Sequence, residues 1–201
     1  MASLPFPSVS AARLVSWCRQ YDWQRVALRC VDDRWADELD RASIEVCEWS
    51  AGSNADAALM LDDTFGAEYS RDRADAGEFP GAGVIGPRGS VLVDASCPAA
   101  GRDGELELTP LVVDVDRVVL LTASRHQYRR IDIADGAISA RVVEPIAVER
   151  IDDAAAAADL QLVARSVDWT DTPFRGGAPC HLSWFRNTEA EPGPVRAASH
   201  R

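Results

Sequence analysis

Apolar and polar residues alternate along much of this chain, and alternation with a period of two is typical of half-buried β-strands. Alternating or short apolar runs predict strands over 24–33, 41–49, 55–61, 91–96, 105–113, 116–123, 136–145, 160–169 and 181–185. The run 55–61 is apolar at almost every position, so it suits a strand that is buried on both faces. Helices are predicted at 9–20, from apolar spacing, and at the alanine-rich 152–161.

Eight or nine strands with little helix between them favour an antiparallel β-sandwich or barrel. The expected fold class is mostly β: an antiparallel β-sandwich over residues 41–186, with a short N-terminal helix and one small internal helix. Residues 1–40 hold that helix and the first strand as part of the same domain, and the polar segment 187–201 is expected to be a disordered tail. The Gly-, Asp-, Arg- and Pro-rich segment 62–89 is expected to be irregular, and its pattern indicates no role.

The chain is acidic, with a formal net charge of −11, and all 21 of its Lys or Arg residues are arginine. A chain without lysine has no Schiff-base lysine, P-loop lysine or lysine general base. The negative charge disfavours nucleic acid as a partner. No apolar run is long enough to insert into a membrane and no secretory signal is evident, so we expect a cytoplasmic protein.

Cysteine and histidine indicate no catalytic pair. Five cysteines, an odd number without a CxxC pair, are typical of reduced, mostly buried thiols. The three histidines are His126, His181 and His200. Cys180 and His181 are adjacent, so on a strand they point to opposite faces. A pair that is distant in sequence, such as Cys97 with His181, stays open, and nothing has zinc-ligand spacing.

Three other features have a structural and a functional interpretation. The basic run 124–130 suits an anionic ligand or acidic partner, although a solvated loop between strands is the commoner case. The glycine-rich run 81–89 lacks the strand–turn–helix context of a dinucleotide site, so a flexible loop is expected. The aromatic residues Trp49, Trp169, Trp184, Phe174 and Phe185 either line a cavity or, more commonly, fill the core.

Four stretches resemble the TerD family, the calcium-binding β-sandwich domain of bacterial tellurite-resistance and stress-response operons. They are IEVCEW (44–49), NADAALMLDD (54–63), GRDGELEL (101–108) with VDRVVLLTA (115–123), and ADGAISARVVE (134–144). They stand in the family's order between about residues 42 and 170. The resemblance implies a non-enzymatic domain with a calcium site.

The calcium ligands implied by the resemblance are Asn54, Asp56, Asp103 and Glu105. Calcium prefers about six to eight oxygen ligands, and residues two apart can face one side of an extended loop. Asp62 and Asp63 are a further source of oxygens. The sequence departs from the family where Asn54 replaces an aspartate and where Arg102 adds positive charge to the acidic loop. The alternative is that these acids are solvated turn residues.

The leading functional hypothesis is a TerD-like stress-response domain that binds calcium weakly or not at all and acts through protein partners in a larger complex. It predicts that the chain is not an enzyme. The alternative is a small lipocalin-like β-barrel cyclase or isomerase with an aromatic-lined pocket for an apolar substrate. A structural subunit of an assembly is a third possibility, and it predicts an exposed apolar patch or an unpaired edge strand.

Overall fold

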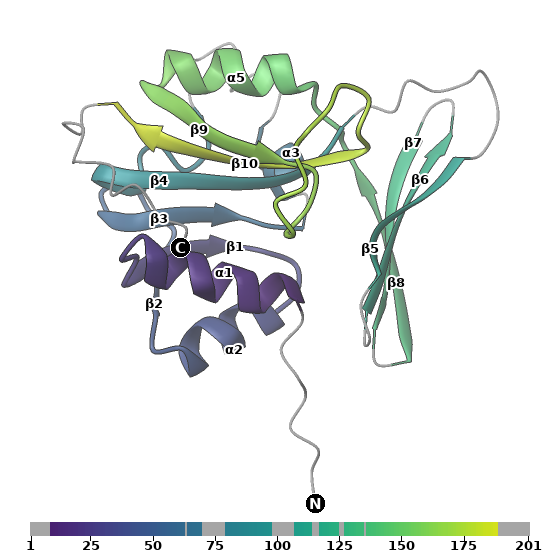
Figure 1. The fold of residues 1–201 in the computed structure, drawn as a ribbon, viewed down its shortest axis with the longest axis horizontal. Coiled ribbons are helices and arrows are strands. Elements are labelled where there is room, and N and C mark those ends of the chain that lie inside the picture. Colours follow the sequence, from purple (N-terminus) through teal and green to yellow (C-terminus); the bar gives the residue numbers. More distant parts are fainter. Residues whose placement is uncertain are drawn as a thin grey trace, which may run out of the picture.

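The computed structural model describes residues 9–62, 64–69, 79–97, 107–113, 117–124, 127–134 and 136–188. These residues form two separate β-sheets and four helices (Figure 1). The helices are α1 (Val9–Gln20), α2 (Arg34–Arg41), α3 (Thr64–Glu68) and α5 (Val148–Ala157). The larger sheet contains β1 (Arg25–Arg29), β2 (Glu45–Cys47), β3 (Ala55–Met60), β4 (Ile85–Ser96), β9 (Leu160–Ser166) and β10 (Cys180–Asn187). The smaller contains β5 (Glu107–Val113), β6 (Arg117–Ser124), β7 (Gln127–Ala134) and β8 (Ala137–Val143).

The larger sheet is mixed and mostly parallel, with the strand order β2-β1-β3-β4-β10-β9. Strands β2, β1, β3 and β4 pair in parallel, whereas β10 runs antiparallel to both β4 and β9. The chain passes from β1 to β2 on one side and then returns to place β3 on the other side of β1. The point between β1 and β3 is therefore where the strand order reverses.

Helices cover both faces of this sheet, as the two apolar clusters show. On one face, α1 and α2 contribute Leu14, Trp35 and Leu39 to a cluster that includes alternate residues of β3. On the other face, α3 and α5 contribute Phe65 and Ile151 to a cluster with the intervening residues of β3. Strand β3 is buried on both sides because each side has a helical layer to pack against.

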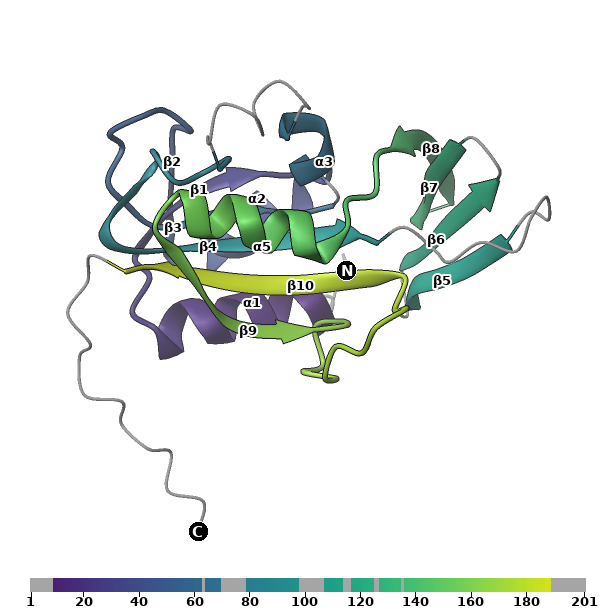
Figure 2. The same ribbon diagram turned by 90° about the horizontal axis from the view of Figure 1, so that it is seen from above.

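The smaller sheet is an antiparallel meander in the order β5-β6-β7-β8, inserted between β4 and α5. It stands beyond the carboxyl ends of the parallel strands, to the right of the main body in Figure 1. Figure 2 shows the same separation from above. This position places one face of the meander opposite the loops that follow β1 and β3.

The predicted antiparallel β-sandwich is wrong, although most of the predicted strands exist. The structure has a mostly parallel sheet between two helical layers, which is an α/β architecture. Alternation of apolar and polar residues indicates which face of a strand is buried, but it does not indicate whether the neighbouring strand runs parallel or antiparallel. The doubly buried run at 55–61 was the local sign of a helix-covered parallel sheet.

Four segments differ from their predicted local structure. Helix α3 lies within the segment 62–89, which was expected to be irregular. Helix α2 was not predicted, because only Trp35 and Leu39 of its residues are buried and the rest read as a polar connection. Most of the basic run 124–130, predicted as a loop, belongs to β7. Residues 85–89, predicted as part of a flexible glycine-rich loop, form the start of β4. The predicted tail falls largely on residues 189–201, outside the described part of the chain, and stays a prediction.

The register between β3 and β4 shifts between Ala55 and Ala57, and Gly89 lies in the resulting bulge of β4. A Cβ atom at Gly89 would lie 2.5 Å from the Cβ of Ile85 and 3.1 Å from the carbonyl oxygen of Ala55. We therefore expect Gly89→Ala to lower the free energy of unfolding by about 1–3 kcal/mol, as overpacking does. Urea denaturation tests this, with Gly83→Ala as the control because no atom lies within 4 Å of that position. Equal stability of the two variants would contradict the close approach.

All cysteines in the described residues are free, and Cys18, Cys97 and Cys180 are buried. Burial raises the pKa of the Cys18 thiol to about 12, so it stays protonated. The prediction of reduced, mostly buried thiols is confirmed. No helix in the described ranges combines the length and apolar character needed to cross a membrane.

Candidate functional site

The carboxyl ends of β1 and β3 lie side by side where the strand order reverses. The chain leaves β1 toward α2 on one face of the sheet, and leaves β3 toward α3 on the other face. The two loops therefore diverge and open a crevice between them. In open α/β sheets, ligands bind in the crevice at this reversal, outside the carboxyl ends of the strands.

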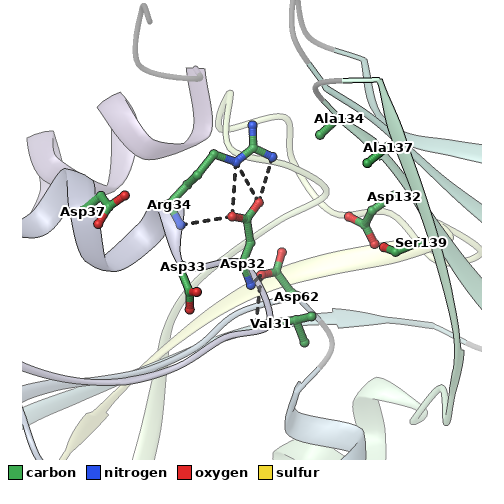
Figure 3. Close-up of a pocket in the computed structure, with 10 residues that line it drawn as sticks. All are labelled: Val31, Asp32, Asp33, Arg34, Asp37, Asp62, Asp132, Ala134, Ala137 and Ser139. Carbon is green, nitrogen blue, oxygen red and sulfur yellow. Dashed lines mark hydrogen bonds and ion pairs between the residues drawn. The ribbon is translucent and has the colours of Figure 1, made fainter.

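A cavity of about 360 Å³ occupies this crevice, which is within the range of small-molecule sites. One wall comes from the loop after β1, the first turns of α2, and Asp62 after β3. The opposite wall comes from Asp132, Ala134, Ala137 and Ser139 of the smaller sheet (Figure 3). The cavity thus lies between the two sheets, with each contributing one side.

Carboxylates dominate the cavity lining, which contains five aspartates and one arginine. Asp33 and Asp37 are exposed. The Asp32 carboxylate accepts hydrogen bonds from Arg34, at 2.9 Å from Nε and 2.8 Å from Nη2 (Figure 3). A crevice lined by one sign of charge raises the local concentration of opposite ions. The cavity therefore favours a positively charged small molecule.

Asp62 belongs to the cavity wall formed by the ends of β1 and β3, and it is 1% exposed. Its Oδ2 atom accepts bonds from Trp35 Nε1 at 3.0 Å and, at a longer 3.3 Å each, from the backbone N–H groups of Val31 and Asp32. Its Oδ1 atom accepts a hydrogen bond from Arg130 Nη2 at 3.0 Å, and the Arg130 side chain is 3% exposed. A buried charge requires such pairing, and these bonds connect β7 to the loop after β1.

The smaller sheet contributes two further contacts to this wall. Arg141 on β8 donates to the carbonyl oxygen of Asp62, and Arg130 Nε lies 3.4 Å from Asp132 Oδ2. The backbone N–H of Asp62 donates to Asp94 on β4 at 3.3 Å. The two sheets are therefore joined at the crevice by ion pairs and hydrogen bonds through Asp62.

The connection between β1 and α2 contains no glycine, since the first glycine of the chain is Gly52. In dinucleotide-binding sheets, glycines at this turn let a ligand approach the backbone closely. Here Val31, Asp32 and Asp33 carry side chains at the turn, and Asp62 already accepts two of its N–H groups. The turn keeps its donors but does not leave them open to an incoming anion.

Glu48 and Trp49 follow β2 at the same edge of the sheet, because β2 is parallel to β1. An acid at the end of the second strand is the group that binds ribose hydroxyls in dinucleotide-binding sheets. Glu48 is exposed, and the guanidinium of Arg29, the last residue of β1, lies 5.4 Å from the Trp49 ring centre. The end of β2 therefore places an exposed acid, Glu48, next to an aromatic ring, Trp49, in the sequence.

Cys30 and His181 lie near this edge, but the pKa of each is shifted in the direction that makes it less reactive. Burial raises the pKa of Cys30 to about 11, with the charges of Asp62, Asp33 and Asp32 adding to the shift, so the thiol stays protonated. Burial lowers the pKa of His181 to about 3, and its Nδ1 lies 2.7 Å from Ser183 Oγ. Neither residue is placed as a nucleophile or general base at neutral pH.

The predicted calcium ligands do not line the crevice where they are described. Asn54 and Asp56 lie at the amino end of β3, the opposite edge of the sheet, and Asp56 Oδ2 accepts the N–H groups of Gln24 at 2.9 Å and Arg25 at 2.8 Å. Asp103 and Glu105 lie outside the described residues. Within the described ranges, no group of three or more His, Cys, Asp or Glu side chains is arranged to hold a metal.

In the sequence, Asp62 was named only as a further calcium ligand, Arg130 only as part of the basic run 124–130 that suits an anionic ligand or acidic partner, and Glu48 had no assigned role. An available signal was that Glu48 follows one strand directly and Asp62 follows another after a single residue, at an edge where parallel strands present their loops together. No local signal identifies the pairing of Arg130 with Asp62, which lies 68 residues away.

Three solved structures show what this fold is similar to. The CcbJ methyltransferase from Streptomyces caelestis has a TM-score of 0.58 and 15% identity, covering 91% of this chain and 90% of its own. An S-adenosylmethionine-dependent methyltransferase from Clostridium acetobutylicum has a TM-score of 0.59 and 8% identity, covering 92% and 93%. The sugar N-methyltransferase KedS8 from Streptoalloteichus sp. has a TM-score of 0.52 and 14% identity, covering 89% and 87%. No protein-family model matches the sequence. No curated protein matches it either.

These findings correct the earlier expectations. The resemblance to TerD and the non-enzymatic stress-response role are wrong, because all three of these similar structures, each matched over nearly the whole chain, are methyltransferases. The calcium cofactor is wrong as well, since the named cofactor among these structures is S-adenosylmethionine and the described residues form no metal site. The lipocalin-like alternative is wrong because the strands form a mixed sheet with a separate meander. The chain has the fold of the S-adenosylmethionine-dependent methyltransferases.

Proposed function

We propose that this chain is an S-adenosylmethionine-dependent methyltransferase whose acceptor is an amino group on a small molecule. The observation that carries the proposal is the acidic cavity at the strand-order reversal of a methyltransferase fold. The acceptor class follows from KedS8, which is named a sugar N-methyltransferase. An amine and the cofactor's own cationic groups both suit a cavity lined by carboxylates.

The residues present fit most of this cofactor. Asp33 and Asp37 would attract its cationic sulfonium and ammonium groups, and Glu48 would accept hydrogen bonds from its ribose hydroxyls. The end that fits least well is the cofactor's carboxylate, because Asp62 already occupies the donors at the turn after β1. S-adenosylmethionine, when bound, supplies an electrophilic methyl group, which an uncharged amine accepts with the loss of one proton.

The smaller sheet would hold the acceptor. Asp132 and Ser139 line the wall opposite α2, so they face the space next to the cofactor side of the cavity (Figure 3). A carboxylate at Asp132 would orient an acceptor amine by a charge-assisted hydrogen bond. Protein partners and a cytoplasmic location, both expected from the sequence, stay predictions beside this proposal.

Calorimetric titration with S-adenosylhomocysteine, the demethylated form of the cofactor, tests the proposal. We expect binding by the full chain, and we expect Glu48→Gln to weaken it about tenfold, the effect of losing a charged hydrogen bond. Glu45→Gln is the matched control, because Glu45 begins the same strand, pairs with Arg25 and lies at the other edge of the sheet. We then expect amino sugars to accelerate formation of S-adenosylhomocysteine from S-adenosylmethionine. No binding by any variant would overturn the proposed function.

A further inference from the structure

Four hydrogen-bond donors converge on a single carboxylate in the wall of the cavity. They are Trp35 Nε1 and Arg130 Nη2, both at 3.0 Å, and the backbone N–H groups of Val31 and Asp32, both at 3.3 Å. The acceptor is the side chain of Asp62. Two of the donors come from buried side chains, since Trp35 is 4% exposed and Arg130 is 3% exposed.

This set of donors has the chemistry of a carboxylate-binding site. A planar guanidinium matches a carboxylate, and backbone N–H groups before a helix attract anions. The Arg130 side chain reaches one oxygen and the other three donors reach the second, so both oxygens are satisfied. The site also lies where ligands of open α/β sheets bind, which a purely structural ion pair does not require.

We propose that Val31, Asp32, Trp35 and Arg130 form a carboxylate-binding cradle, and that Asp62 is its built-in competitor for the carboxylate of an amino-acid-like ligand. Asp62 comes from the loop after β3, next to the loop after β1 that supplies the two backbone donors. A ligand carboxylate enters only when the Asp62 carboxylate leaves. Naming that ligand as the cofactor rests on the proposed function, whereas the cradle itself does not.

Acetate rescue tests the cradle without the cofactor. Asp62→Ala removes the carboxylate on which the four donors converge, and acetate is small enough to replace the lost group. We expect 100 mM acetate to raise the Tm of Asp62→Ala by about 3–5 °C more than equal chloride does, and to leave the wild type unchanged by comparison. Asp56→Ala is the control, because Asp56 also accepts two backbone N–H groups but lies at the other edge of the sheet. An equal acetate effect on all three proteins would overturn the proposal.

A second variant and a second readout keep the two proposals separable. If Asp62→Ala does not fold, Asp62→Ser keeps a small polar group and is expected to show the same rescue. Calorimetry with S-adenosylhomocysteine should give about tenfold tighter binding to either variant than to the wild type. If acetate rescues Asp62→Ala but S-adenosylhomocysteine does not bind, the proposed function is contradicted and the carboxylate-binding cradle is supported. Equal binding by wild type and variant would show that Asp62 does not compete.

Discussion

Replacing Arg130 by methionine is expected to lower the free energy of unfolding by about 3–5 kcal/mol. Arg130 lies 3.0 Å from Asp62, and the two side chains are 3% and 2% exposed. Methionine fills similar volume but leaves the Asp62 carboxylate buried without its guanidinium, and an uncompensated buried charge is costly. Urea denaturation at neutral pH measures the loss.

The control for this substitution is the neighbouring residue on the same strand. Arg129 is exposed and its side chain points to the opposite face of β7, so Arg129→Met is expected to change stability by about 0.5 kcal/mol or less. The double variant Arg130→Met with Asp62→Leu should recover most of the lost stability, because a well-packed apolar pair can replace a buried ion pair. A loss below about 1 kcal/mol in Arg130→Met would show that the remaining donors to Asp62 suffice.

The stability of the chain is expected to fall as the pH drops from 6.5 toward 3, through His181. This side chain is 0% exposed, and its pKa is lowered from 6.5 to about 3, mainly by burial and then by the nearby Arg165, with Asp152 opposing. Between these two values the unfolded chain binds a proton that the folded chain does not, so acid favours unfolding. The slope reaches about 1.4 kcal/mol per pH unit, and the full effect is on the order of several kcal/mol.

Comparing the wild type with His181→Asn isolates this contribution from that of the carboxylates. At pH 7.5 the variant is expected to be less stable, because it loses buried ring contacts. As the pH falls from 6.5 to 4.5 the gap should narrow by roughly 1 kcal/mol per unit, since asparagine has no proton to bind. Leu182→Ala is the control: it destabilises the adjacent buried position, and its gap to the wild type should not depend on pH. A constant gap for His181→Asn would show that His181 titrates normally in the fold.

Local patterns in the sequence were enough to place several of the strands and helix α1. The alternation at 25–29 and the apolar runs at 55–60 and 117–124 each correspond to a strand, and the apolar spacing at 9–20 corresponds to α1. Successive side chains of a strand point to opposite faces, so the pattern that identifies a strand is visible within a few residues. Helix α2 escaped notice because its two buried residues are too few for a periodic signal.

The direction of the strands and the composition of the site depend on contacts between distant parts of the chain. Strand direction depends on where each connection crosses and which face its helix covers, and single-strand patterns carry no such information. Asp62 in the cavity wall bonds to Trp35 and Arg130, which lie far from it in the chain and meet it because two sheets converge on the ends of β1 and β3. An aspartate after a strand has the same local appearance in a solvated turn as in a buried ion pair. Its environment is set by residues that folding brings to it.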